Sequence, residues 1–151
     1  MARFVFRLQS YLSVKEQLEE QKKNEYGQAM KRLEEERQRK RKLENELEDN
    51  ILRFKKTLFT SIIPTEISRY NNRIEILKVW IIEQEERIKA AEHYVEEKRL
   101  ELVEAMKERK ALDTVKERNY EEFLKEEQRV EQTVVDGIVS YQYAERQANV
   151  L

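Results

Sequence analysis

The chain has 151 residues, of which 40% are charged and 39% hydrophobic, with only two glycines and one proline. This composition is typical of long helices with few turns, so it excludes a globular fold with many connections and disfavours an enclosed catalytic cavity. Basic and acidic residues nearly balance at a net charge of −1, which argues against a nucleic-acid partner, and the absence of cysteine excludes disulfides.

The first predicted element is a helix over residues 3 to 62. Its start is strongly apolar (Phe4, Val5, Phe6, Leu8, Tyr11 and Leu12) and is expected to continue directly into the helix. A start at Ser13, which with Glu16 fits a capping box, is the alternative. Arg3 and Arg7 interrupt the apolar run, so no secretory signal is predicted. No apolar stretch reaches the roughly 18 residues that span a membrane, so we expect a cytoplasmic protein without direct membrane insertion.

Further along this helix the apolar residues lie on a drifting stripe with a polar gap from Glu34 to Lys42, and Gly27 is a predicted soft point. The gap contains a basic run: Arg37, Arg39, Lys40, Arg41 and Lys42. Glutamates precede and follow this run at pairing distance along a helix, which favours a solvated surface. Binding of an acidic protein is the alternative.

A bend is predicted at residues 61 to 66, because Pro64 cannot continue the first helix. Folding the chain about Pro64 would place Phe54 opposite Ile74 and Leu12 opposite Lys116. Because short connections join antiparallel helices, we expect an all-α fold, a long antiparallel two-helix coiled-coil hairpin that forms a single domain over residues 1 to 151.

The second predicted helix covers residues 66 to 145 and contains a sustained seam, typical of a helix that supercoils with a partner. Alternating steps of three and four residues visit Ile67, Tyr70, Ile74, Leu77, Ile81, Gln84, Ile88, Ala91, Val95, Lys98, Leu102, Ala105, Arg109, Leu112, Lys116, Asn119, Phe123, Glu126 and Val130. Trp80, with Val79 and Ile82, lies beside the seam; it is either covered by the first helix or a partner-binding patch. After Gln128 the pattern continues through Val130, Val134, Ile138 and Tyr141, loosened by Gly137.

No residues suggest catalysis, a cofactor or a metal. His93 is the only histidine and has no second ligand of its kind, so it is expected on the helix surface. Two glycines cannot build a phosphate-binding loop. We therefore expect a protein that is not an enzyme and uses no cofactor.

Two stretches of the chain carry a distinctive pattern. The first is Phe4-Val5-Phe6-Arg7-Leu8-Gln9 with Leu12 and Lys15. The second is Glu104 to Leu112, then Lys116, Arg118, Tyr120, Phe123, Glu126, Glu127, Glu131, Asp136, Ile138 and Tyr141 to Tyr143. Together they resemble the FliJ family of the flagellar type III export apparatus. Asp113 stands where glutamate is more usual in that family, and Gly137 where an acidic residue is common.

The resemblance implies a stalk-like coiled coil that binds the export ATPase hexamer and promotes its assembly and activity. It also implies contacts with the large export-gate membrane protein and with export chaperones, in the cytoplasm and peripherally associated with the inner-membrane flagellar export apparatus. By this analogy an ATPase-binding tip would comprise Phe4, Phe6, Arg7, Leu8, Leu12, Phe123, Ile138, Tyr141 and Tyr143. Gate or chaperone contacts would involve Phe54, Leu58, Tyr70 and Trp80. The equivalent stalk of a virulence-type secretion system and a structural homodimer are the alternatives.

Overall fold

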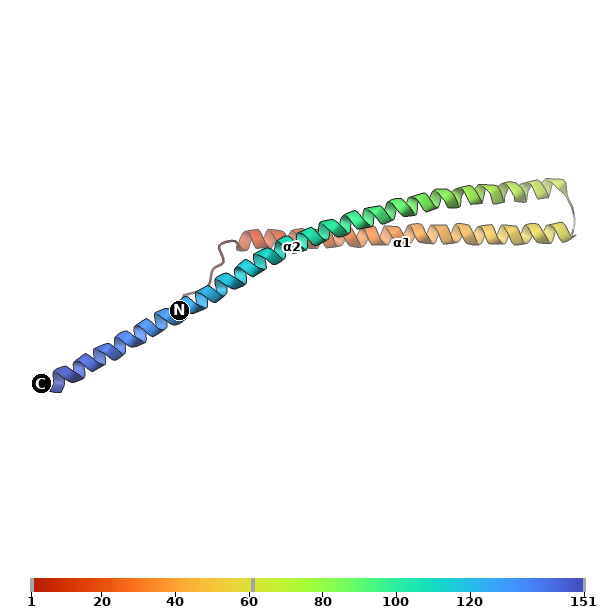
Figure 1. Ribbon diagram of the computed structural model, residues 1–151. Helices are drawn as coiled ribbons and strands as arrows, with labels where there is room; N and C mark the ends of the chain where they lie inside the picture. Colours follow the sequence, from red (N-terminus) through yellow and green to blue (C-terminus); the bar gives the residue numbers. More distant parts are fainter. Residues whose placement is uncertain (1, 61, 151) are drawn as a thin grey trace. The chain divides into compact units, whose positions relative to one another are not determined.

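The computed structural model describes residues 2–60 and 62–150, and two long helices account for nearly all of them (Figure 1). Helix α1 covers Gln9–Thr60 and helix α2 covers Pro64–Val150, with no strand among the described residues. The helices pack antiparallel, which confirms the predicted all-α two-helix hairpin. Residues 19–104 form one compact unit, and residues 2–18 with 105–150 form a second. The single domain expected over residues 1 to 151 stays a prediction.

The reversal lies in the first unit, between Thr60 and Pro64; Ser61, part of the predicted bend, is outside the described residues. The carbonyl oxygen of Ile63 accepts hydrogen bonds from the backbone nitrogens of Glu66 and Ile67, both at 3.1 Å. Pro64 is therefore the first residue of α2, a position where the missing N–H costs nothing and the fixed φ suits a helix. It begins the second helix two residues earlier than predicted.

The position of this turn corrects the predicted register. The rings of Phe54 and Tyr70 pack with centroids 6.3 Å apart. The observed partner of Phe54 is therefore one helical turn nearer the bend than the expected partner, Ile74. The expectation assumed that the chain reverses at Pro64. Because Pro64 already belongs to α2, the reversal centres on Ile62, and the pairs shift accordingly.

The predicted α2 seam is confirmed within the first unit. Every position from Ile67 to Leu102 is buried or half-buried, and Leu77 is completely inaccessible. The spacing of about 3.5 residues keeps this stripe against α1 along the unit. The polar stretch expected to interrupt the apolar stripe of α1 still contributes to the seam, because Glu36 is buried there and Lys40 is half-buried.

The polar seam residues satisfy one another. The side-chain nitrogen of Gln84 donates to the backbone oxygen of Glu36 at 2.9 Å and also to its carboxylate. Both side chains are buried, and no buried side-chain polar atom in the described chain lacks a partner. A sequence search for apolar residues alone misses such positions, since burial here depends on pairing rather than on hydrophobicity.

In the second unit, residues 2–8 form a non-helical strap, so α1 begins at Gln9 rather than near residue 3 as predicted. The carbonyl oxygen of Leu8 accepts the first helical hydrogen bond, from Leu12 nitrogen at 2.8 Å. Along the strap Phe4 and Phe6 are covered while Val5 is 76% exposed. This alternation has the period of extended backbone; in a helix, residues two apart would face different sides.

The seam of α2 continues in this unit through Phe123, but Glu126 and Val130 are exposed, which corrects the prediction for those two positions. All residues from 131 to 150 are exposed. Within this unit α1 and the strap cover the seam side of α2 as far as Phe123. No described residue of the unit buries the positions from 131 to 150.

Candidate protein-binding surfaces

The N-terminal members of the predicted tip form an aromatic cluster with α2. The Phe4 ring packs edge-on against Tyr120 at 5.2 Å between centroids and against Phe123 at 5.5 Å. Tyr120 and Phe123 stack on each other at 6.4 Å. The unit thus brings Phe4 and Phe123 together, as the predicted tip requires, but as mutual packing partners.

Phe6 and Leu12 are core residues of the same unit, with 5% and 1% of their surface exposed. The Lys116 ammonium lies 6.0 Å from the centre of the Phe6 ring and also donates to the Gln9 side-chain oxygen at 2.8 Å. Buried side chains cannot contact a partner without unfolding of the strap. Arg7 and Leu8 are exposed and can make such a contact.

The C-terminal members of the predicted tip lie on an uncovered helix surface. We call the apolar row Val130, Val134, Ile138 and Tyr141 the end stripe; its members are 46% to 70% exposed. Successive members are four, four and three residues apart, so they form one face of α2, although they do not keep the strict alternation of the seam. A seam-like face without a covering helix is a candidate protein-binding surface.

Tyr143 lies on a different side of α2 from Tyr141, because residues two apart in a helix are separated by about 200°. It is 64% exposed, and its hydroxyl accepts a hydrogen bond from the Gln147 side chain at 3.0 Å. Val135 and Val139, each more than half exposed, widen the apolar surface on the flank. The end of α2 can therefore contact a partner on more than one side.

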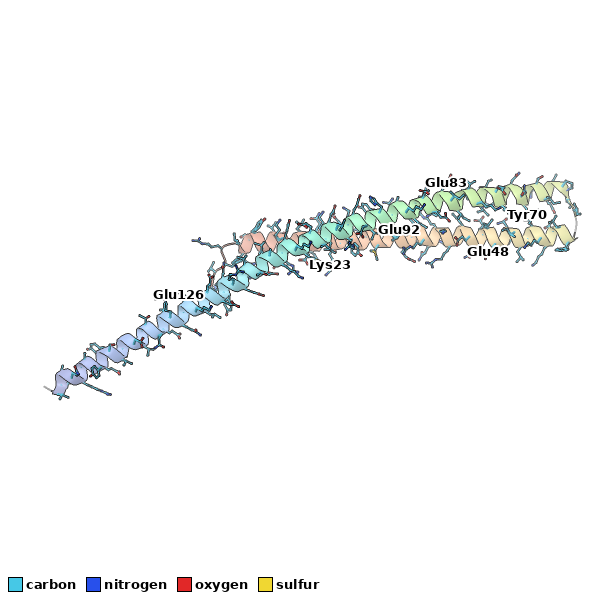
Figure 2. All side chains as sticks on the ribbon, viewed as in Figure 1. Lys23, Glu48, Tyr70, Glu83, Glu92 and Glu126 are labelled. Atoms are coloured by element: carbon cyan, nitrogen blue, oxygen red, sulfur yellow. The ribbon has the colours of Figure 1, made fainter. Side chains whose placement is uncertain are left out.

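The predicted gate or chaperone residues lie near the turn of the first unit. Phe54 and Tyr70 pack on each other, and Figure 2 shows Tyr70 between the arms, while Leu58 is 42% exposed. Trp80 is 41% exposed, and the Arg73 guanidinium lies 5.1 Å from its ring centre. Trp80 is thus partly exposed, with a cation from its own helix against its ring.

The most exposed aromatic ring at this end was not among the predicted residues. Phe59 is 91% exposed and Ile62, in the turn, is 73% exposed. Their position just before Pro64 is the signal that could have found them, since a tight reversal leaves the last side chains of the first helix uncovered. Ile76, Val79 and Ile82 form a further exposed apolar group on α2.

Ion pairs link the two arms of the first unit. Lys22 and Lys98 surround Glu25 and Glu101, with nitrogen–oxygen distances of 3.2 to 3.4 Å. Hydrogen bonds from Lys22 and then Lys98 lower the pKa of Glu101, and the bond to Glu101 raises the pKa of each lysine. For Glu25, partial burial opposes the same two lysines, and the net pKa is lowered.

The predicted basic run is mostly neutralised by glutamates. Arg37 pairs with Glu92, Arg39 with Glu36, Lys40 with Glu44 and Glu85, and Arg41 with Glu34. These contacts favour the solvated-surface interpretation of the run.

Neither a metal-binding group of acidic, histidine or cysteine side chains nor a helix apolar enough to cross a membrane occurs in residues 2–60 and 62–150. His93 lies on the surface of α2, 3.2 Å from a Glu97 oxygen. The surfaces described above are thus the features of the molecule that suggest partners.

Comparison with known proteins identifies the family. The family described as flagellar FliJ protein matches residues 4–148. A solved structure described as a candidate YscO homologue, CT670 of Chlamydia trachomatis, is similar at 22% identity, a TM-score of 0.46 and coverage of 97% of this chain and 98% of that one. No curated protein matches the sequence. Because the matched residues span nearly the whole chain, the protein belongs to the FliJ family of flagellar type III export components.

Proposed function

We propose that this protein is a stalk in flagellar type III export whose C-terminal end of α2 binds the export ATPase hexamer and promotes its assembly and activity. The observation that carries the proposal is the end stripe, a continuation of a coiled-coil seam with no covering helix in its unit. Family membership supplies the choice of partner.

The physical argument rests on exposed apolar area. Val134, Ile138 and Tyr141 each have more than half of their surface in water. Burying such side chains contributes about 25 cal/mol per Å² of apolar area removed from water. A binding site inside a ring can cover several sides of one helix at once, which suits the apolar flank as well as the stripe.

The N-terminal residues of the predicted tip have a supporting role in this proposal. Phe4, Phe6 and Leu12 hold the strap and α1 on α2, and Arg7 and Leu8 offer exposed groups to the ATPase. The protein acts by binding and not by catalysis, with no cofactor.

The turn of the first unit provides the second set of contacts. We assign contacts with the large export-gate membrane protein or with export chaperones to Leu58 and Trp80, together with Phe59, while Phe54 and Tyr70 support them from within. These contacts would place the protein in the cytoplasm, peripherally associated with the inner-membrane export apparatus.

The test is stimulation of the cognate export ATPase by the wild-type chain and by the variant Ile138→Ala/Tyr141→Ala. Both residues are exposed, so the variant should fold normally and lose most of the stimulation. The matched control is Leu52→Ala/Leu100→Ala, which removes two side chains that are each 55% exposed elsewhere. Unchanged hydrolysis on adding the wild-type chain, or equal loss in both variants, would contradict the proposal.

The two alternatives predict different outcomes. A homodimer that covers the end stripe with a second copy would show twice the chain mass in solution, reduced to one by Ile138→Ala/Tyr141→Ala. A stalk of a virulence-type system would stimulate the ATPase of a needle complex more strongly than that of a flagellum.

A further inference from the structure

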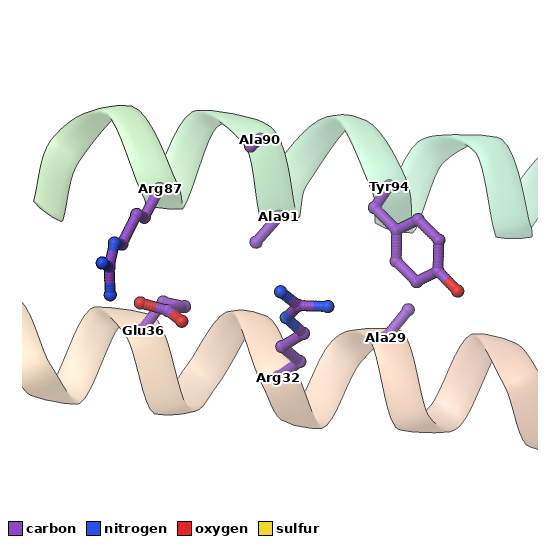
Figure 3. A pocket seen from close by; sticks show the side chains of 7 residues that line it. All are labelled: Ala29, Arg32, Glu36, Arg87, Ala90, Ala91 and Tyr94. Atoms are coloured by element: carbon purple, nitrogen blue, oxygen red, sulfur yellow. The ribbon is translucent and has the colours of Figure 1, made fainter. Parts of the chain in front are cut away.

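The seam of the first unit contains a hollow lined by a small side chain from each arm. Ala29 on α1 and Ala91 on α2 occupy seam positions and are almost fully buried. The hollow has a volume of about 340 Å³. Its lining is Ala29, Arg32, Glu36, Arg87, Ala90, Ala91 and Tyr94 (Figure 3). We call it the alanine hollow.

Two arginines border this hollow from opposite arms. Arg32 extends from α1 toward Ala91, and Arg87 extends from α2 toward α1 (Figure 3). Both side chains are exposed, and neither has an ion pair or hydrogen bond to any other described residue. Most other cations near the seam of this unit are paired, Lys22, Arg37 and Lys40 among them. The hollow therefore has two guanidinium groups available to an external acceptor.

The carboxylate in the hollow, Glu36, is the group toward which Arg87 extends in Figure 3, but among the described residues it forms no ion pair with either arginine. Glu36 accepts from Gln84 and pairs with Arg39 at 3.5 Å. Tyr94, 42% exposed, provides an aromatic edge. Donors thus exceed acceptors around an apolar floor, which is the chemistry that recognises a carboxylate.

The surroundings indicate an elongated occupant. Two further hollows adjoin the first and share Arg32 with it. One lies between the arms and reaches Glu25 and Gln28, and the other is lined by α1 alone and reaches Lys31, Glu35 and Arg39. A groove that follows the arms is longer than a single small anion. A helix lying in it would place small or apolar residues on the two alanines and carboxylates toward a guanidinium on each side.

From this geometry we infer that the groove at the alanine hollow binds an acidic helix of a partner protein, with Arg32 and Arg87 holding its carboxylates. The inference goes beyond the proposed function and does not depend on it, because it concerns a different surface from the end stripe and the turn.

The test uses the full chain labelled with ¹⁵N and a blocked, alanine-based helical peptide that carries glutamates four residues apart. We expect the arginine Nε–H signals of Arg32 and Arg87 to shift saturably with this peptide and not with its glutamine counterpart. The variant Arg32→Gln/Arg87→Gln should weaken binding on the order of tenfold. The matched control, Arg53→Gln/Arg69→Gln, removes one exposed arginine from each arm and should leave the affinity unchanged.

Four results would overturn the inference. Equal binding of the glutamine peptide, or equal weakening by the control variant, would show that the groove does not select carboxylates. The same shifts produced by inorganic phosphate would assign the arginines to a free anion. Shifts that depend on chain concentration alone would assign the groove to a second copy.

Discussion

Two stretches of α2 each carry an apolar stripe along one helix face and differ in what covers them. From Ile67 to Leu102 every seam position is buried or half-buried in its unit, whereas from Val130 onward every position is exposed. The sequence pattern is alike because both stretches are built to be covered. The difference teaches that a heptad seam identifies a contact surface but not its partner, which is α1 in the first case and, in our proposal, the export ATPase in the second.

The largest expected loss of stability comes from truncating a side chain in the covered seam. Leu77→Ala removes a completely buried side chain and should lower the free energy of unfolding by about 2 to 5 kcal/mol. Ile138→Ala, a comparable truncation on a side chain that is 53% exposed, should change it by less than about 0.5 kcal/mol. Urea unfolding followed by circular dichroism measures both. Similar costs for the two variants would mean that the end stripe is covered in the free protein.

The next effect tests the strap. Phe6→Ala should lower the free energy of unfolding by about 1.5 to 3 kcal/mol, because a nearly buried ring is lost. Val5→Ala, next to it and 76% exposed, is the control and should have little effect. Amide exchange near Tyr120 and Phe123 should quicken only in the Phe6 variant. If both variants behave alike, the alternating pattern of the strap is absent in solution.

These variants also show how much the sequence could predict. From Ile67 to Phe123 the α2 seam follows from its spacing, because the period of a supercoiled helix is set by geometry alone. The strap was mispredicted as helix since an apolar terminus fits both periods over a few residues; only the alternation of Phe4 and Phe6 around Val5 distinguishes them. The register was wrong by one turn because Pro64 can end one helix or begin the next.

The candidate sites were less accessible to sequence reasoning. The predicted tip mixed residues that its unit buries, such as Phe6 and Leu12, with residues it exposes, such as Ile138. The sequence alone does not distinguish an apolar residue that will be buried from one that will be exposed, because burial depends on which other segments pack against it. Likewise the density of basic residues in the basic run suggests a binding site, yet ion pairs with glutamates neutralise much of its charge. The arginines without an ion pair to a described residue that we assign to binding, Arg32 and Arg87, lie outside this run.

A smaller change in stability is expected from replacing either of the two glycines by alanine. An added Cβ meets nothing within 4 Å at either Gly27 or Gly137. Gly27→Ala lies where α1 is paired and should raise the free energy of unfolding by about 0.5 to 1 kcal/mol. Gly137→Ala should increase helix content and slow local amide exchange, with little change in global unfolding because its surroundings are exposed. A large global stabilisation by Gly137→Ala would contradict the uncovered state of this segment.

The smallest effect concerns the ion pairs of the first unit. The pKa of Glu101 is lowered from its usual 4.5, so its contribution is present above that pH and is lost as the pH falls through the lower folded value. The pKa of Lys22 is raised from 10.5, so its contribution is lost only as the pH rises through the higher folded value.

Glu101→Gln should therefore reduce the urea midpoint near neutral pH and flatten its decline in acid. Glu75→Gln is the control, because Glu75 pairs only along its own helix, with Lys78 at 3.6 Å. If the urea midpoint falls as steeply with decreasing pH in the Glu101 variant as in the wild type, these ion pairs do not contribute to the stability of the first unit.

The most direct test of the central claim is amide hydrogen exchange of the full chain, measured with and without the export ATPase hexamer. Our account predicts that residues 130 to 145 exchange quickly in the free protein and become protected in the complex, while residues 67 to 102 are protected equally in both. Unchanged exchange at residues 130 to 145 on saturating the chain with the ATPase would contradict it.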